Sequence, residues 1–207
     1  MTQTTSPENK IWLECASCGH CSPLGNRPLY CPQCGGDWLD ARYDYQALAP
    51  MWSQKLARRP FTSFWRYREL LPVRDPRHAL CLGEGFTPLV RAERLGQELG
   101  FDNLLIKDEG LNPTGSFKAR GLGVAVSRAY ELGATALSIP SAGNAAGAMS
   151  AYAARAGLPA HVFMPRDVPH PFVAECRALG AKVTLVDGLI TDAGRIAAEG
   201  VREFGRF

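Results

Sequence analysis

The chain has 207 residues, of which 46% are hydrophobic and 21% are charged, and its formal net charge at pH 7 is +3. This composition is typical of a globular protein with one ordinary domain and a small additional module. The small net charge gives no support for a nucleic-acid-binding protein, no apolar stretch approaches the length of a transmembrane helix, and the opening residues lack the pattern of a signal peptide.

A cluster of cysteines dominates the first part of the chain. Five of the seven cysteines fall within residues 15–34. Clustered cysteines without a secretory signal indicate a metal site rather than disulfides. We therefore predict a zinc ribbon over residues 11–45, preceded by a disordered polar tail over residues 1–10.

Four of these cysteines have the spacing of a structural zinc site. Two Cys-x2-Cys pairs are separated by 12 residues, and two such knuckles can close a tetrahedral set of four thiolates. Gly19 and Gly35 suit the tight backbone of the knuckles. Cys21 and His20 are possible alternative ligands, since Cys21 forms a further x2 pair with Cys18. The favoured metal ligands are Cys15, Cys18, Cys31 and Cys34.

A connector over residues 46–81, rich in proline, arginine and aromatic residues, leads to an α/β domain over residues 82–207. In this domain short apolar strands alternate with helices that end at glycines, which predicts βαβ crossovers and an open, mostly parallel sheet with helices on both faces. The predicted strands are 104–107, 135–140, 160–165 and 182–187; the predicted helices are 116–132, 145–156, 171–179 and 191–204.

Lys118 lies in the first turn of the helix predicted over residues 116–132. The helix dipole at that end favours the neutral form of an amine, and a neutral amine can form a covalent bond to a carbonyl group. An ordinary solvated lysine is the alternative. The preceding Gly110–Gly115 segment resembles a phosphate-binding loop only in part, because Ser116 and Phe117 replace the Lys-Ser/Thr pair.

A second turn of small residues, Ser141–Gly147, lies between a predicted strand and a predicted helix. Small residues allow a ligand to approach the backbone closely, and a helix N-terminus offers free N–H groups to an anion such as a carboxylate. A tight βα turn capped by Asn144 is the alternative.

Together and in this order, these two turns resemble fold-type II pyridoxal-phosphate (PLP) enzymes, the group of threonine synthase, threonine dehydratase and cysteine synthase. Leu82–Leu89 resembles the entry motif of threonine synthases, Asn112–Lys118 the cofactor-lysine motif, and Ser141–Asn144 the asparagine loop. Phe64–Tyr67, with the Leu70–Pro72 segment, is similar to the threonine synthase connector, and a cysteine ribbon followed by Ala41–Tyr45 is similar to a subset of that family.

The resemblance implies a role for each motif. Lys118 would carry PLP covalently and move protons during the reaction, with Phe117 beside the cofactor. Asn144 would hydrogen-bond the phenolic oxygen of the cofactor and lie beside the substrate. Substrate-carboxylate contacts are implied for Ser141, Gly143 and Ala145, with Thr87 nearby. For a threonine synthase, the reaction converts O-phosphohomoserine and water to L-threonine and phosphate.

Two departures from the family pattern affect this interpretation. Ala119 stands where many threonine synthases have an acidic residue, so that Lys118–Gly121 is closer to the dehydratases. A dehydratase or β-replacement enzyme of the same fold is therefore an alternative. The glycine-rich loop that binds the PLP phosphate in the family is not found in this sequence. We expect a truncated chain that lacks the C-terminal half of the fold.

A non-catalytic zinc-ribbon fragment or remnant is the third alternative, because of that apparent truncation. For the enzyme we expect a cytoplasmic protein that acts on a small amino-acid substrate, with PLP and a structural zinc ion as cofactors. We expect no nucleic-acid or membrane partner, and a homodimer when the protein is full length.

Overall fold

The computed structural model describes residues 11–25, 30–52, 58–59 and 63–204, so the expected disordered tail lies outside the described residues. The described residues form two compact units. The first runs to residue 59 and includes residues 66–74, and the second comprises residues 63–65 and 75–204. The connector residues are thus divided between the two units.

The first unit is built on a small antiparallel sheet in the order β2-β1-β3. Residues Trp12 and Leu13 pair with Pro23 and Ser22 on one side, and Ile11 pairs with Tyr43 on the other. This sheet brings the two halves of the cysteine-rich segment side by side. Its strands are β1 (Ile11–Cys15), β2 (Cys21–Pro23) and β3 (Leu39–Tyr43).

A short helix, α1 (Tyr45–Trp52), follows β3 directly. Asp44 Oδ1 accepts a hydrogen bond from the backbone N–H of Ala47 at 2.9 Å, which satisfies one of the free donors at the start of the helix. Leu48 from this helix is buried, as is Ile11 from β1. The unit also contains the ion pair between Arg59 and Glu69, whose closest N–O distance is 2.6 Å.

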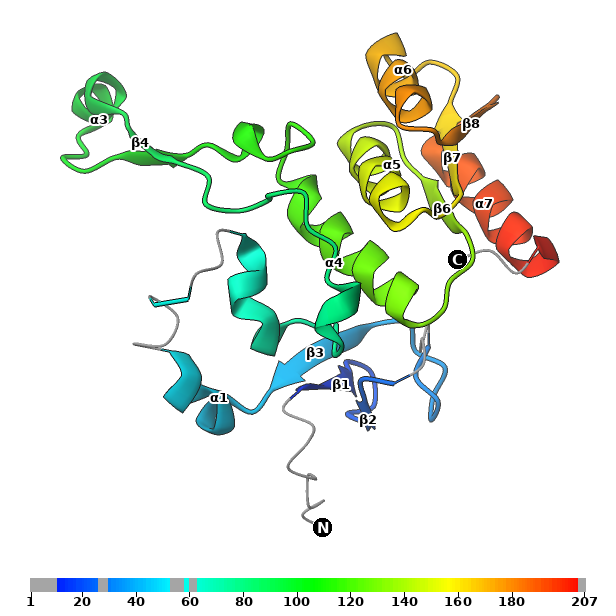
Figure 1. Ribbon diagram of the computed structural model, residues 1–207, viewed down its shortest axis with the longest axis horizontal. Helices are drawn as coiled ribbons and strands as arrows, with labels where there is room; N and C mark the ends of the chain where they lie inside the picture. Colours follow the sequence, from blue (N-terminus) through cyan, green and yellow to red (C-terminus); the bar gives the residue numbers. More distant parts are fainter. Residues whose placement is uncertain (1–10, 26–29, 53–57, 60–62, 205–207) are drawn as a thin grey trace. The chain divides into compact units, whose positions relative to one another are not determined.

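The second unit contains a parallel sheet in the order β6-β7-β8. The helices α5 and α6 lie on one face of this sheet, and α7 packs against β6 and β7 on the other face (Figure 1). The predicted parallel sheet with helices on both faces is therefore confirmed. The strands are β6 (Leu137–Pro140), β7 (Ala160–Pro165) and β8 (Lys182–Val186).

The four predicted helices are present, with bounds that differ from the prediction by one or two residues. Glycines 133, 157 and 180, which follow three of them, have φ between +69° and +84°, as expected for left-handed helix ends. The helices are α4 (Lys118–Glu131), α5 (Asn144–Ala156), α6 (His170–Ala178) and α7 (Ile190–Phe204). Among the described residues, no helix combines the length and apolar character needed to cross a membrane.

The strand predicted over residues 104–107 does not join the parallel sheet, which corrects that part of the prediction. It is β5 (Leu105–Lys107), and it pairs antiparallel with β4 (Leu89–Arg91) in a separate two-stranded sheet. The helix α3 (Glu93–Leu99) between them was not predicted. An apolar run indicates a strand but does not specify its partner, and here the partner is the nearest strand along the chain.

Three short 3-10 helices complete the described structure. The first, η1 (Phe64–Leu70), contains the connector aromatics, and the indole Nε1 of Trp65 donates to the carbonyl of Leu80 at 2.8 Å. The others are η2 (Pro76–His78) and η3 (Glu109–Leu111). Phe61, another connector aromatic, lies outside the described residues.

The core of the second unit is centred on α5 and β7. Residues 146–153 of α5 are buried, and most of them are alanine, glycine or serine. Such small side chains let α5 pack closely against α4 and α6 as well as the sheet. At Gly123 of α4 an added Cβ would lie 3.0 Å from the Cζ of Tyr152, so the ring of Tyr152 lies directly on this glycine.

A buried carboxylate lies beside the hydroxyl group of Tyr152. Glu84 is fully buried, and its Oε2 accepts hydrogen bonds from the Tyr152 hydroxyl at 2.6 Å and from the Leu82 backbone N–H at 2.9 Å. Burial raises the pKa of Tyr152, and so does the neighbouring Glu84, so the phenol holds its proton and remains a donor. This contact fixes the segment after Leu82 to α5.

Replacing Tyr152 with phenylalanine should destabilise the chain by about 1–3 kcal/mol, because the buried carboxylate of Glu84 loses a hydrogen-bond donor. Urea denaturation followed by circular dichroism measures this change. Tyr130→Phe is the matched control, since Tyr130 is 36% exposed, and should change stability by less than about 0.5 kcal/mol. Equal stability of Y152F and the unmodified chain would contradict the assigned role of this hydrogen bond.

Candidate functional site

The four predicted metal ligands converge in the first unit. The sulfurs of Cys15, Cys18, Cys31 and Cys34 all lie within 4.8 Å of one another. Two of the Sγ–Sγ distances, Cys15–Cys34 and Cys18–Cys31, are 3.6 Å. A tetrahedral zinc ion with Zn–S bonds of about 2.3 Å needs sulfurs roughly 3.8 Å apart. The donor set therefore fits a structural zinc ion.

The backbone of the two knuckles explains this convergence. In each, the N–H of a glycine with positive φ donates to the carbonyl of the first cysteine at 2.9 Å: Gly19 to Cys15, and Gly35 to Cys31. The positive φ at both positions explains the preference for glycine there. The second knuckle also has Gly36, whose N–H donates to the Sγ of Cys34 at 3.4 Å.

The thiols are electrostatically suited to a cation. The backbone N–H of Cys18 lowers the pKa of Cys15 to about 7. At Cys18 the backbone N–H of His20 favours the thiolate, but the neighbouring thiols outweigh it and raise the pKa to about 12. Without a cation, the first cysteine to ionise makes ionisation of its neighbours less favourable. A bound divalent ion instead stabilises all four thiolates. Cys21 is exposed and its Sγ contacts the Gly19 carbonyl at 3.6 Å, outside this cluster.

The purified chain should contain about one zinc ion, released by a thiol-reactive mercurial and detected with a colorimetric chelator. Cys34→Ser should lose most of this zinc, because serine is a poor zinc ligand. Cys21→Ser is the control and should keep it. Retention of zinc by C34S together with loss in C21S would show that the ligand set is different.

The second cluster of polar residues surrounds the start of α4. Lys118 is the first residue of this helix, whose start was predicted at residue 116, and is half-buried, with its Nζ 4.4 Å from the ring centroid of Phe117. Ser116 accepts a hydrogen bond from the Lys118 backbone N–H at 3.3 Å, which holds the turn before the helix. Gly115 has φ of +68° in this turn.

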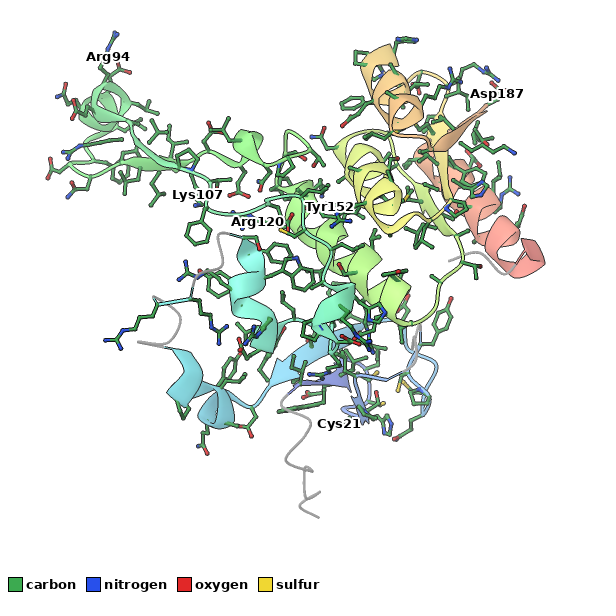
Figure 2. All side chains as sticks on the ribbon, in the orientation of Figure 1. Cys21, Arg94, Lys107, Arg120, Tyr152 and Asp187 are labelled. Atoms are coloured by element: carbon green, nitrogen blue, oxygen red, sulfur yellow. The ribbon has the colours of Figure 1, made fainter. Side chains whose placement is uncertain are left out.

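An ion pair that the sequence did not reveal involves Arg120, two residues after Lys118 in the same first turn of α4. The guanidinium of Arg120 donates to both carboxylate oxygens of Glu109, at 2.6 Å through Nε and 2.8 Å through Nη2. Thr87 joins this pair, since its hydroxyl donates to Glu109 Oε1 at 2.5 Å and accepts from Arg120 at 3.2 Å. Figure 2 labels Arg120, and also Lys107, whose Nζ donates to the backbone carbonyl of Thr87.

Asn112 extends this network towards the entry motif. Its Nδ2 donates to Glu109 Oε2 at 3.1 Å, and its Oδ1 accepts from the backbone N–H of Gly85 at 3.2 Å. The network thus joins three segments: 85–87, 107–112 and the first turn of α4. Glu109 and Arg120 were not predicted as site residues, because charged side chains at these positions have no distinctive spacing. The sequence signal that could have identified them is their position on either side of the Asn112–Lys118 motif.

The ion pair with Arg120 and the hydroxyl of Thr87 hold the pKa of Glu109 at about 2. A lowered carboxylate pKa stabilises the fold above the ordinary pKa of about 4.5, and the stabilisation is lost as the pH falls towards 2. Glu109→Gln should therefore destabilise the chain by about 1 kcal/mol at pH 7. The difference should shrink between pH 4.5 and pH 2.

Urea denaturation of both proteins at pH 7 and at pH 3 measures this difference. Glu98→Gln, on the exposed surface of α3, is the matched control and should give no difference at either pH. A difference between E109Q and the unmodified chain that is the same at both pH values would contradict the ionic origin of the effect.

The second predicted turn lies where β6 ends and α5 begins. Ser141 is buried, and its Oγ accepts hydrogen bonds from the backbone N–H groups of Ala146 at 3.2 Å and Gly143 at 3.4 Å. Gly143 is the N-cap residue and makes no side-chain cap bond, so the alternative that Asn144 caps the helix is wrong. Asn144 is exposed at the first position of α5.

The structure groups the predicted site residues into two sets. Thr87 belongs with the network beside Lys118, and Ser141, Gly143, Asn144 and Ala145 share one turn. The two sets lie at the N-terminal ends of α4 and α5, which pack together through Gly123 and Tyr152. Within the described residues, no hydrogen bond joins Lys118 directly to the Ser141–Ala145 turn.

Residues 80–207, more than half of the chain, match the family of pyridoxal-phosphate dependent enzymes. The chain belongs to this family. The threonine synthase of Methanocaldococcus jannaschii is 40% identical over 180 residues, which are 86% of this chain and 44% of that protein. That of Methanosarcina acetivorans is 38% identical over 182 residues, 87% of this chain and 44% of that protein. The chain therefore spans less than half the length of these relatives.

Solved structures of PLP-dependent enzymes share the fold. The processed form of threonine deaminase isoform 2 from Solanum lycopersicum matches with a TM-score of 0.53 and 31% identity, over 58% of this chain and 33% of that chain. Maize serine racemase matches with a TM-score of 0.54 and 26% identity, over 58% of this chain and 36% of that chain. The predicted fold-type II architecture is confirmed.

The residues around Lys118 fit the cofactor of this PLP-enzyme family. PLP needs an amine for its aldehyde and polar groups for its oxygens. The amine of Lys118 is present, and the buried Oγ1 of Thr114, four residues earlier, has no hydrogen-bond partner within the described structure. Because a buried hydroxyl without a partner is costly, this atom is a suitable donor to a bound ligand.

Proposed function

We propose that this chain provides the cofactor lysine of a threonine-synthase-type lyase, which converts O-phosphohomoserine and water to L-threonine and phosphate. The observation that carries the proposal is the position of Lys118 at the start of α4, within a chain that is about 40% identical to threonine synthases. In this reaction phosphate leaves the substrate, and water supplies the hydroxyl group of L-threonine.

In this proposal Lys118 binds the cofactor covalently and then moves protons on the substrate carbons. Bound PLP supplies an electron sink for the bonds that are broken. The ring of Phe117 covers the amine, since the Nζ–centroid distance is 4.4 Å. The Glu109–Arg120 ion pair and Asn112 hold the segments on either side of the lysine in a fixed geometry.

The Ser141–Ala145 turn is proposed to bind the substrate carboxylate, through the Ser141 hydroxyl and the backbone N–H groups of Gly143 and Ala145. Asn144 is exposed and does not cap the helix. Its side-chain amide is therefore available to hydrogen-bond the phenolic oxygen of PLP. Thr87 is proposed to lie near the substrate, although its hydroxyl already donates to Glu109.

The zinc site is proposed to be structural. Four thiolates complete a tetrahedral site and leave no position for a substrate. We propose a reducing compartment such as the cytoplasm, in which these four cysteines stay available as zinc ligands. We also propose that the full-length enzyme is a homodimer.

A threonine or serine dehydratase is the second candidate. It is favoured by the Lys118–Gly121 sequence, in which alanine follows the lysine, and by the structural likeness to a threonine deaminase. Two product assays separate the candidates. A threonine synthase releases phosphate from O-phosphohomoserine, whereas a dehydratase releases ammonia from serine or threonine.

The cofactor assignment is tested by incubating the protein with PLP, reducing it with borohydride and mapping the pyridoxyl adduct by mass spectrometry. We expect the adduct on Lys118 and none at this site in Lys118→Ala. Lys182→Ala, which changes an exposed lysine on β8, is the control and should keep the adduct. An adduct only on another lysine, or no adduct at all, would exclude the proposed role of Lys118.

A further inference from the structure

The helix α6 packs beside α5 (Figure 1). Two of its side chains, Phe172 and Glu175, are three residues apart and therefore lie on the same side of the helix. Both are half-buried. They contact the start of α5 at two glycines, Gly143 and Gly147, and so lie next to the turn that is proposed to bind the substrate carboxylate.

The ring of Phe172 lies against Gly143. A Cβ added at Gly143 would be 3.6 Å from the Cζ of this ring, which is an ordinary van der Waals distance. The ring also packs against the hydrophobic core of the second unit. Phe172 therefore supports, from the side of α6, a residue whose backbone N–H is proposed to bind the substrate.

The carboxylate of Glu175 lies against Gly147, in the first turn of α5. A Cβ added at Gly147 would be 2.5 Å from Oε1 and 2.6 Å from Oε2 of Glu175. Glycine is less favourable than alanine inside a helix. At this position, however, only glycine leaves room for the carboxylate, so the close contact accounts for the glycine.

Glu175 places a negative charge beside the end of α5 that attracts anions. The N-terminal end of a helix has positive partial charge and N–H groups without intrahelical partners. Within the part of the chain that the structure describes, the carboxylate of Glu175 forms no ion pair, so a cation does not neutralise it there. Its half-buried position also reduces screening by salt. The charge therefore lowers the attraction of the turn for a second anion.

We propose that Glu175 is a specificity-determining residue, whose charge weakens the binding of carboxylate ligands at the Ser141–Ala145 turn. The contacts of Phe172 and Glu175 with the two glycines hold the charge at a fixed distance from the turn. Because the carboxylate of the substrate does not react, the charge affects binding and leaves the chemical step unchanged. This role rests on the proposed function of the turn, but it does not depend on which of the candidate reactions follows.

Binding of L-alanine to the PLP-loaded protein, measured by calorimetry, tests this role. L-Alanine has the carboxylate but no leaving group, so neither candidate reaction consumes it. Glu175→Gln keeps the shape of the side chain and removes its charge, and should bind L-alanine about two- to fivefold more tightly at low ionic strength. The gain should decrease as salt is added. L-Alaninamide, which lacks the carboxylate, should show no gain.

Two further variants separate the charge from the shape of the side chain. Glu175→Asp keeps the charge but is shorter, and should bind L-alanine as the unmodified protein does. A purely structural role would instead give the larger change in E175D. Glu98→Gln is the matched control for loss of a carboxylate, since Glu98 is exposed on α3, and should bind normally. Circular dichroism should show that all three variants are folded.

Gly147→Ala tests the contact itself. The added methyl group would take the place of the Glu175 carboxylate, which must then move away from α5. This variant should therefore also bind L-alanine more tightly. Adding E175Q to G147A should give a smaller gain than E175Q gives alone, because the two changes act on one contact.

Equal affinity of E175Q and the unmodified protein for L-alanine would overturn this role of Glu175 and leave the proposed function intact. The same gain for L-alanine and L-alaninamide would also overturn it, because the effect would not depend on the carboxylate. A carboxylate-dependent gain in a protein that releases no phosphate from O-phosphohomoserine would support the role of Glu175. That result would count against the proposed reaction alone.

Discussion

The geometry of the Lys118 region depends on the hydrogen bonds and the ion pair made by the carboxylate of Glu109. It binds Arg120 of α4, the hydroxyl of Thr87 and the amide of Asn112. These partners come from three stretches of the chain. Without the carboxylate, the Arg120 guanidinium and the buried Thr87 hydroxyl would lose the acceptor that they share.

A second carboxylate, which is fully buried, has a similar role. Glu84 lies in the entry motif and is bound by Tyr152 of α5. The entry segment is therefore attached to α5 through Glu84 and to the turn before α4 through Gly85 and Asn112. Two acidic residues with different partners thus give the lysine-bearing turn a geometry that hydrophobic packing alone would not specify.

The sequence predicted those elements whose signals are local. The strand β7 was predicted with the correct bounds because its apolar run is flanked by Gly157 and Arg166. The four cysteines predicted as zinc ligands converge, as the Cys-x2-Cys spacing requires. By contrast, β4 and α3 are short and partly polar, so their sequence signals are weak. The pairing of β5 with β4 depends on tertiary contacts, which the periodicity of the sequence does not encode. The roles of Glu109 and Glu84 were not predicted for the same reason, since both depend on residues distant in sequence. The assignments of Lys118 and Asn144 rest on motif resemblance and stay predictions.

The contact between Gly123 and Tyr152 has an evolutionary consequence. Because an added methyl group at position 123 would meet the ring of Tyr152 at about 3 Å, the two helices approach as closely as a hydrogen atom on Cα permits. The side chains at the two positions can therefore change only in concert, with a smaller ring compensating for a larger residue. Among homologous sequences, this pair should therefore covary.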